Sequence, residues 1–188
     1  MKSYFLIFIS ILFIFSSCFK KEEKNLKYFD INIILNDQIE RLGKYNPTLF
    51  RKVFIGNEFL SVFKKDNKWK KELQILNDLD ISFFFLKNFY NISTKYLYPY
   101  KISKYKIKKN IKTKVYEMNI YYNKKKLSKL HIYFKENNIL YHSKRNFILK
   151  FNKNILGNIL ISSYLINGKQ AIILNNTVNY HINVDIFY

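Results

Sequence analysis

Residues 115–134 read VYEMNIYYNKKKLSKLHIYF, two stretches of alternating apolar and polar residues around a polar centre. Apolar or aromatic side chains occupy every second position in 116–122 and again in 130–134. An extended chain points successive side chains to opposite faces, so each stretch has one apolar face. Because the intervening Asn123–Lys126 is short and polar, the pattern predicts two neighbouring antiparallel strands that bury one face of a sheet.

The same period of two continues from about Tyr96 to the C-terminus, with polar turn signals between the apolar runs. Asn167-Gly168 is the strongest of these signals, because Asn-Gly is favoured in two-residue hairpin turns. Consecutive strands with short turns form an antiparallel meander, here of about six to eight strands. Its second half is expected to contain the strands Ile139–Ser143, Phe147–Phe151, Leu160–Ile166, Lys169–Leu174 and Val178–Ile186.

The part of the chain before residue 96 alternates between helical and extended patterns. Apolar residues at three- and four-residue spacing predict a helix from an Asp30 cap to Leu42, ended by Gly43. Apolar runs around Gly56-Asn57 predict a β-hairpin. A second helix is expected over 67–79, capped by Asp66 and burying the face that carries Trp69, Leu73 and Leu76. The apolar stretch 83–90 fits either a helix or a strand.

These elements predict one α+β domain over residues 28–188. The N-terminal helix, the hairpin and the second helix would pack on the antiparallel meander, which would form a curved sheet or a partial barrel.

The N-terminus has the features of a bacterial export signal. A single Lys2 precedes a run of apolar residues, 4–15, which is shorter than the roughly 20 residues of a transmembrane helix. The run ends in Phe-Ser-Ser-Cys at 15–18, and Cys18 is the only cysteine. We therefore expect a signal peptide over residues 1–17. Residues 18–27 would then consist of Cys18, carrying a diacylglyceryl thioether, and a flexible charged tether that links it to the domain.

The formal net charge is +20, and 30 of the 33 basic residues are lysine. Lysine, isoleucine, asparagine, phenylalanine and tyrosine share A/T-only codons, so an AT-rich genome explains much of this composition. The four glycines are scattered, which excludes a glycine-rich phosphate loop. One cysteine excludes an intrachain disulfide and a cysteine-built zinc site.

No set of residues predicts catalysis, so we expect no enzymatic activity and no metal or cofactor. His131, His142 and His181 fall in expected strands, and His131 and His181 lie on polar faces. His181 and Asp185 lie about 13 Å apart along a strand, too far to share one ion. The acidic pairs Asp37-Glu40 and Asp66-Glu72 fit cap and surface roles better than acid–base catalysis.

Besides the cysteine motif, the order of elements and several short stretches resemble those of a known family: Asp30-Ile31, Ile39–Leu42, Asn46-Pro47, Lys68–Leu73, Asp80-Ile81 and Asn138–Tyr141. The chain is similar to a small uncharacterised lipoprotein family of Bacteroidota. The resemblance implies envelope origin and lipid anchoring at Cys18, and no chemistry.

The sequence therefore predicts a membrane-anchored lipoprotein of the cell envelope, on the periplasmic or surface face of the outer membrane, with a noncatalytic role in binding or assembly. Its expected partners are the membrane and a lipid or another envelope protein, and not nucleic acid. Alternatives are a carrier of apolar ligands with a cavity under the sheet, an envelope hydrolase, and binding of anionic polymers or membrane surfaces by the basic segment Lys101–Lys153.

Overall fold

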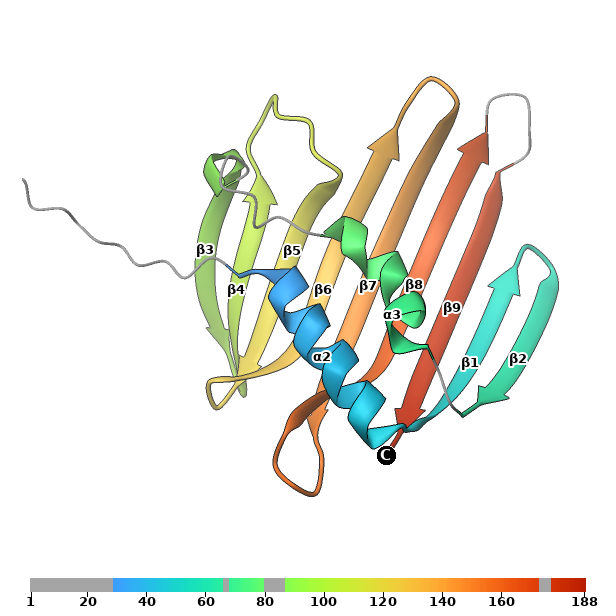
Figure 1. Cartoon of the computed structure of the whole chain (residues 1–188). Helices are drawn as coiled ribbons and strands as arrows, with labels where there is room; N and C mark the ends of the chain where they lie inside the picture. The colour runs from blue at the N-terminus through green and yellow to red at the C-terminus, as the bar shows by residue number, and fades with distance from the viewer. Residues whose placement is uncertain (1–28, 66–67, 80–86, 173–176) are drawn as a thin grey trace, which may run out of the picture.

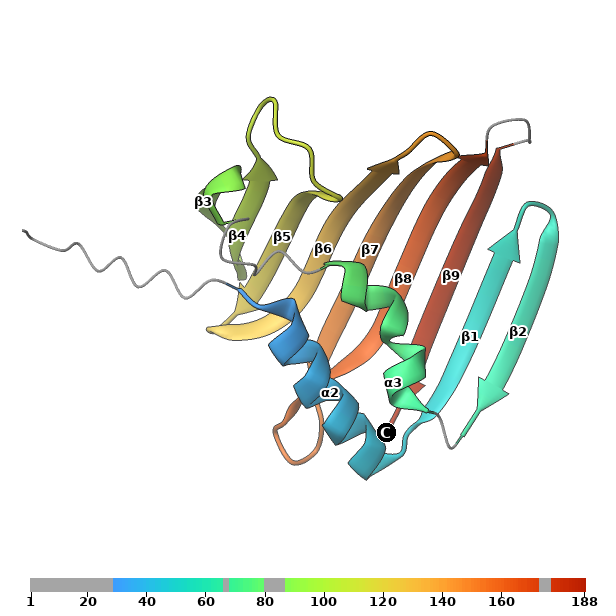
Figure 2. The same cartoon turned by 45° about the horizontal axis from the view of Figure 1, so that its top comes forward.

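A nine-stranded antiparallel sheet dominates the computed structural model, which describes residues 29–65, 68–79, 87–172 and 177–188. The strand order is β2-β1-β9-β8-β7-β6-β5-β4-β3, and α2 and α3 lie on one face, hereafter the inner face (Figure 1). The strands are β1 (Thr48–Ile55), β2 (Glu58–Lys64), β3 (Tyr90–Leu97), β4 (Tyr100–Ile107), β5 (Val115–Asn123), β6 (Lys126–Asn137), β7 (Tyr141–Lys153), β8 (Ile159–Ile172) and β9 (Val178–Phe187). The helices are α2 (Ile31–Tyr45) and α3 (Trp69–Glu72), with 3-10 turns η1 (Gln74–Leu79) and η2 (Lys87–Phe89). The prediction of helices on an antiparallel meander is confirmed in outline, and the sheet is open (Figure 2).

The predicted N-terminal hairpin forms, but it extends the sheet instead of packing on it. Strands β1 and β2 flank Gly56-Asn57, and β1 pairs with β9 along its whole length. The last strand of a meander would otherwise expose its backbone groups, and β1 satisfies them. The hairpin therefore moves the free edge of the sheet outward to β2.

Helix α2 begins as predicted and ends later than predicted. The Asp30 carboxylate accepts hydrogen bonds from the backbone N–H groups of Asn32 and Ile33, at 2.9 and 3.2 Å, as an N-cap does. The helix continues through Gly43, and Asn46 takes the left-handed conformation (φ 43°) that ends it. Pro47 disfavours a helical conformation at the residue before it, which explains why the helix ends there.

The core lies between the inner face and the helices. The buried side of α2 is attached to the start of β8 by Gln38, whose Nε2 donates to Ile159 O (3.1 Å) and whose Oε1 accepts from Ile161 N (2.8 Å). The expected second helix is shorter, since α3 is followed by the 3-10 turn η1. Its predicted apolar face is confirmed, because Trp69, Leu73 and Leu76 are buried; Asp66 and residues 80–86 lie outside the described residues.

Two long strands replace four predicted short ones. Strand β7 runs through both expected segments of 139–151, beginning only at Tyr141 because the Asn138 side chain caps a turn there. Strand β8 runs straight through Asn167-Gly168, where a hairpin turn was predicted. Gly168 faces the Tyr180 ring of β9, and an added Cβ would lie 1.9 Å from its Cζ. Glycine is therefore required at this position because the Tyr180 ring occupies the space of a Cβ, and not because the chain turns there.

The β5–β6 turn is made by Lys124 and Lys125, which both have positive φ (47° and 65°). Left-handed conformations cost an ordinary residue about 1 kcal/mol or more, whereas Asn and Gly adopt them readily. The double change Lys124→Asn/Lys125→Gly is therefore expected to raise the free energy of unfolding by about 1 kcal/mol. Urea unfolding measures this, with Lys108→Asn/Lys109→Gly as a control of the same composition. A loss of stability would contradict the turn geometry.

Within the described parts of the chain, none of the helices combines the length and the hydrophobicity that crossing a bilayer requires.

Candidate functional site

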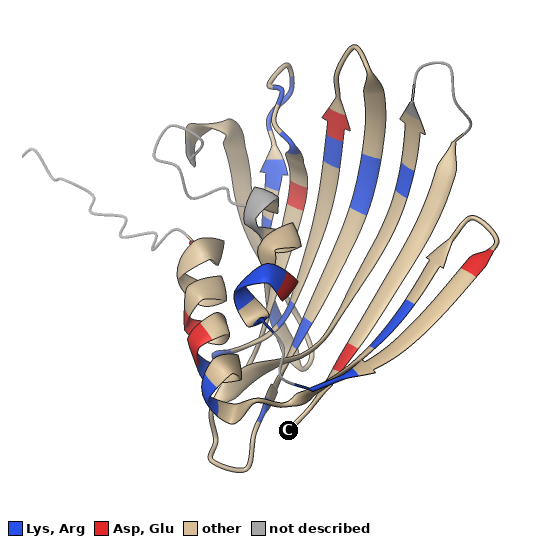
Figure 3. Ribbon diagram, turned by 45° about the vertical axis from the view of Figure 1, so that its right-hand side comes forward, with Lys and Arg blue, Asp and Glu red and all other residues tan. Residues whose placement is uncertain are grey.

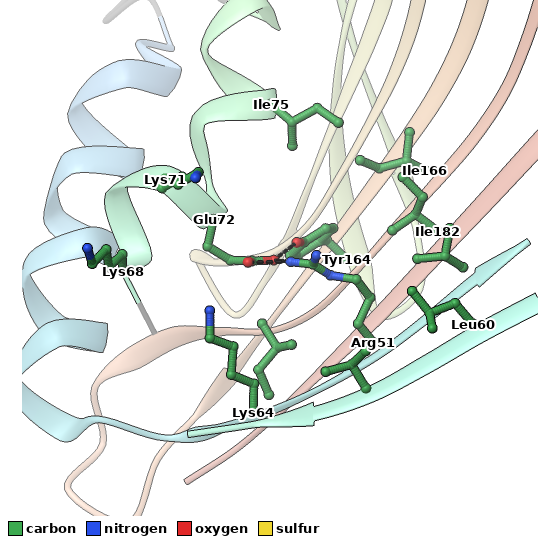
Figure 4. Close-up of a pocket in the computed structure, with 13 residues that line it drawn as sticks. Arg51, Leu60, Lys64, Lys68, Lys71, Glu72, Ile75, Tyr164, Ile166 and Ile182 are labelled. Carbon is green, nitrogen blue, oxygen red and sulfur yellow. Dashed lines mark hydrogen bonds and ion pairs between the residues drawn. The ribbon is translucent and has the colours of Figure 1, made fainter. Parts of the chain in front are cut away.

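A groove opens on the inner face where the sheet extends beyond the helices. It has a volume of about 730 Å³ and lies between α3 and the β1–β2 hairpin, with β8 and β9 contributing to its floor (Figure 4). Sites for small molecules typically enclose about 300–1,000 Å³. The groove therefore has the size of a site for a lipid-sized ligand.

The floor of the groove continues rows of core side chains outward to the sheet edge. Cross-strand pairing aligns Ile166 with Ile182, Ile182 with Val53, and Val53 with Leu60. Ile166 is buried under the helices, whereas Leu60 is 59% exposed. The same apolar pattern thus builds the core where helices cover it and an open apolar surface where they do not.

A polar network crosses this apolar floor and holds α3 to the sheet. Arg51 of β1 donates from Nη2 to both carboxylate oxygens of Glu72 on α3, and the Tyr164 hydroxyl of β8 donates to Glu72 Oε1. The Glu72 side chain is only 9% exposed, so the carboxylate needs these donors to offset the cost of burial. The prediction of a surface role for Glu72 is wrong.

The network also fixes the charge states at the floor. Burial disfavours the charged form of Arg51, but the hydrogen bond and attraction from Glu72 outweigh it and raise the pKa of Arg51 above its ordinary value. Burial, reinforced by the charge of Glu72, raises the pKa of Tyr164 far above its usual range. Tyr164 therefore stays protonated and acts as a donor, and the carboxylate is already engaged by two partners.

Lysines form the rim of the groove. Lys64 ends β2, Lys68 directly precedes α3, and Lys71 lies within α3. Figure 4 shows all three on the side of the groove opposite Ile166 and Ile182, with the amino end of Lys68 farthest from these floor residues. Neither Lys68 nor Lys71 forms an ion pair with a residue in the described ranges. Since Arg51 and Glu72 balance each other, Lys68 and Lys71 leave this part of the groove with an excess of positive charge. Figure 3 shows that Lys and Arg positions outnumber Asp and Glu positions along the described chain.

The outer face of the sheet carries the predicted histidines, with polar residues over its middle strands and phenylalanines at the β1–β2 hairpin. His131 Nε2 lies 2.7 Å from Asn146 Oδ1, and its ring lies 4.5 Å from that of Tyr133. Burial lowers the pKa of His131, which is therefore neutral at pH 7. His181 Nδ1 contacts Asn167 Oδ1 on β8. A shallow hollow of about 740 Å³ at the Asn167 end of this face is lined mainly by tyrosine, asparagine and lysine.

The structure does not bring the other candidate residues into a site. Asp37 forms an ion pair with Arg41 at 2.7 Å, one turn away on α2. Ser162, which belongs to no predicted motif, donates its hydroxyl to a backbone carbonyl, Lys150 O, at 3.3 Å. No group of three or more His, Cys, Asp or Glu side chains that could hold a metal occurs among the described residues. Cys18 lies outside them.

Sequence reasoning missed Arg51 and Tyr164 as site residues. Arg51 is one of three arginines beside 30 lysines. In a chain this rich in lysine, a retained arginine indicates a position where a guanidinium is preferred to an ammonium group, and this was the available signal. Tyr164 lies in an apolar strand and gives no such signal.

The chain matches no family model, no curated protein and no solved structure.

Proposed function

We propose that the protein is a lipid-anchored lipoprotein of the bacterial cell envelope whose domain binds an anionic amphiphile, such as a fatty acid, without catalysis. The observation that supports binding is the groove, which combines an aliphatic floor with a lysine rim. The observation that supports anchoring is the motif that ends at Cys18. The proposed role combines two hypotheses from the sequence, a noncatalytic envelope lipoprotein and a carrier of apolar ligands.

The two halves of the groove suit the two halves of such a ligand. Leu60, Val62 and Ile182 offer an aliphatic surface on which an acyl chain would gain about 0.8 kcal/mol for each buried methylene. Lys68 and Lys71 would attract the carboxylate or phosphate at the other end of the ligand, an attraction that salt screens. Affinity would therefore depend mainly on chain length, and discrimination between anionic and neutral ligands mainly on the lysines.

The groove does not favour the hydrolase alternative. Among the described lining residues there is no serine, cysteine or histidine. The carboxylate of Glu72 is already bound by Arg51 and Tyr164. A general base must be free to reach a substrate proton, so this arrangement fits a structural role for Glu72.

Reversing the rim charge tests the binding proposal. Lys68→Glu/Lys71→Glu is expected to weaken dodecanoate binding roughly tenfold, because each attraction between exposed charges is worth about 0.5 kcal/mol and is replaced by repulsion. Isothermal titration calorimetry of the purified protein measures the affinity. The matched control, Lys65→Glu/Lys70→Glu, makes the same change in net charge outside the groove lining, and we expect it to bind within about twofold of the wild type. Equal weakening in both variants, or no binding by the wild type, would refute the proposal.

Labelling tests the anchor. Cells that express the protein and are fed radiolabelled palmitate should yield a labelled wild-type band in the membrane fraction, because the acyl chains are attached through Cys18. Cys18→Ser should lose the label, since it removes the only thiol. Ser17→Ala, which keeps a small residue beside the intact cysteine, should retain it. Unlabelled wild-type protein would show that Cys18 is not a lipidation site.

A further inference from the structure

Strand β2 is an unprotected sheet edge. All seven residues of Glu58–Lys64 are exposed, including Phe59 (56%) and Phe63 (68%). Edge strands normally carry a proline, a bulge or a central charge that prevents pairing with another chain. In β2 the charges stand only at the two ends, and its pairing with β1 is regular throughout.

The backbone of β2 has a defined set of groups that point away from the sheet. Gly56 N–H donates to Asn179 O of β9 at 2.9 Å, which indicates that even-numbered residues of β1 bond to β9 and odd-numbered ones to β2. By the pairing of β1 with β2, the even-numbered residues of β2 bond to β1. Phe59, Ser61 and Phe63 therefore direct their N–H and C=O groups outward, where a further strand would bond to them.

The sequence of β2, EFLSVFK, is chemically symmetric about its centre. We propose that β2 pairs antiparallel with β2 of a second copy of this chain, centred on Ser61. In that register each Phe59 lies opposite Phe63 of the other copy, and each Leu60 lies opposite Val62. Glu58 lies opposite Lys64 at both ends, so opposite charges meet.

The outward backbone hydrogen-bonding groups and the side chains on both faces of β2 are consistent with this register. Phe59, Ser61 and Phe63 are the outward-bonding residues, and each faces another of them across the two-fold axis, so each pair would exchange two hydrogen bonds. On the outer face Phe63 already stacks on Phe50 (ring centroids 4.2 Å apart) and Phe59 packs on Phe54 (4.6 Å). Pairing would join these aromatic clusters from the two copies. A shift by two residues would place Glu58 opposite Val62 and lose the charge match.

Such pairing closes after two copies, because each copy uses its one β2 edge. The two nine-stranded sheets would become continuous. Leu60, Val62 and Lys64 line the groove described above, so the strand of each copy would border the groove of the other. The dimer follows from the edge itself and does not depend on the ligand.

Charge exchange tests the register. Sedimentation of the purified protein in a density-matched detergent should show a dimer. Glu58→Lys and Lys64→Glu should each shift it to monomer at the same concentration, because like charges then meet at both ends. An equimolar mixture of the two variants should restore a dimer, since every end again pairs opposite charges. A wild type that stays monomeric, or a mixture that stays monomeric, would overturn the proposal.

A backbone variant tests the hydrogen bonds. Ser61→Pro removes an outward N–H and keeps the bonds to β1, so it should give monomer with an unchanged far-ultraviolet circular dichroism spectrum. Ser61→Thr keeps that N–H and should remain a dimer. A folded Ser61→Pro protein that is still dimeric would place the interface elsewhere. If Ser61→Pro proved unfolded, the mixture of charge variants would still decide the matter.

Discussion

Replacing Glu72 by alanine is expected to lower the free energy of unfolding by about 2–3 kcal/mol. The change would leave the Arg51 guanidinium and the Tyr164 hydroxyl without their shared acceptor, and removing one partner of a buried pair typically costs about 3–5 kcal/mol. The lower figure is expected because Arg51 is partly exposed, so water can solvate it in the variant. Because this network joins α3 to β1 and β8, the variant should also bind the proposed ligand more weakly.

Urea unfolding followed by circular dichroism measures the effect. Glu40→Ala, at an exposed position of α2, is the matched control and should change stability by no more than about 0.5 kcal/mol. Replacing both partners, as in Arg51→Met/Glu72→Leu, should recover most of the loss, because a buried ion pair can be exchanged for apolar side chains at little cost. Equal stability of Glu72→Ala and Glu40→Ala would mean that the network is not formed.

Gly168→Ala is expected to destabilise the protein by about 1–3 kcal/mol, the usual cost of forcing extra atoms into a packed site. The new Cβ would overlap the Tyr180 ring, whose Cζ would lie 1.9 Å away. If that overlap is the cause, removing the ring should remove the penalty. In a Tyr180→Ala background the same glycine change should be neutral, or stabilising by up to about 1 kcal/mol, since glycine in a strand is unfavourable without a packing role.

A second glycine provides the control for Gly168. Gly43 lies inside α2 and a Cβ there meets no atom within 4 Å, so Gly43→Ala should raise stability by about 0.5–1 kcal/mol. If Gly43→Ala raises the free energy of unfolding and Gly168→Ala lowers it, the loss at Gly168 comes from the contact with Tyr180 and not from replacing glycine in general. A Gly168→Ala penalty that persists without the Tyr180 ring would contradict the assigned contact.

Local patterns in the sequence predict most of the elements, and long-range contacts explain where the prediction fails. The period of two from Tyr96 onward and the Asp30 cap are local features, and both appear in the structure. Asn167-Gly168 has the composition of a turn, but the contact that requires glycine there comes from Tyr180 on another strand. In the same way, pairing with β9 decides the place of the β1–β2 hairpin, and no feature within the hairpin reveals that partner.

The sequence did not predict the groove at the edge of the sheet. The sequence suggested an apolar cavity under a curved sheet, yet the groove lies at the β1–β2 side, where the helices end short of the sheet edge (Figure 2). Its position depends on the joining of the hairpin to β9 and on the shortness of α3. The pairing of Glu72 with Arg51 and Tyr164 spans up to 92 residues of sequence, and such a contact leaves no local pattern.

The central claim is that the groove beside α3 binds an anionic amphiphile, and Trp69 offers a direct measurement. It is the only tryptophan and adjoins the rim residue Lys68 at the start of α3. A fatty acid that carries a nitroxide spin label on its chain should quench Trp69 fluorescence saturably in the purified protein, and an unlabelled fatty acid should reverse the quenching. We expect the Lys68→Glu/Lys71→Glu variant to require roughly tenfold more ligand. Quenching that does not saturate, or that the unlabelled fatty acid does not reverse, would contradict the claim.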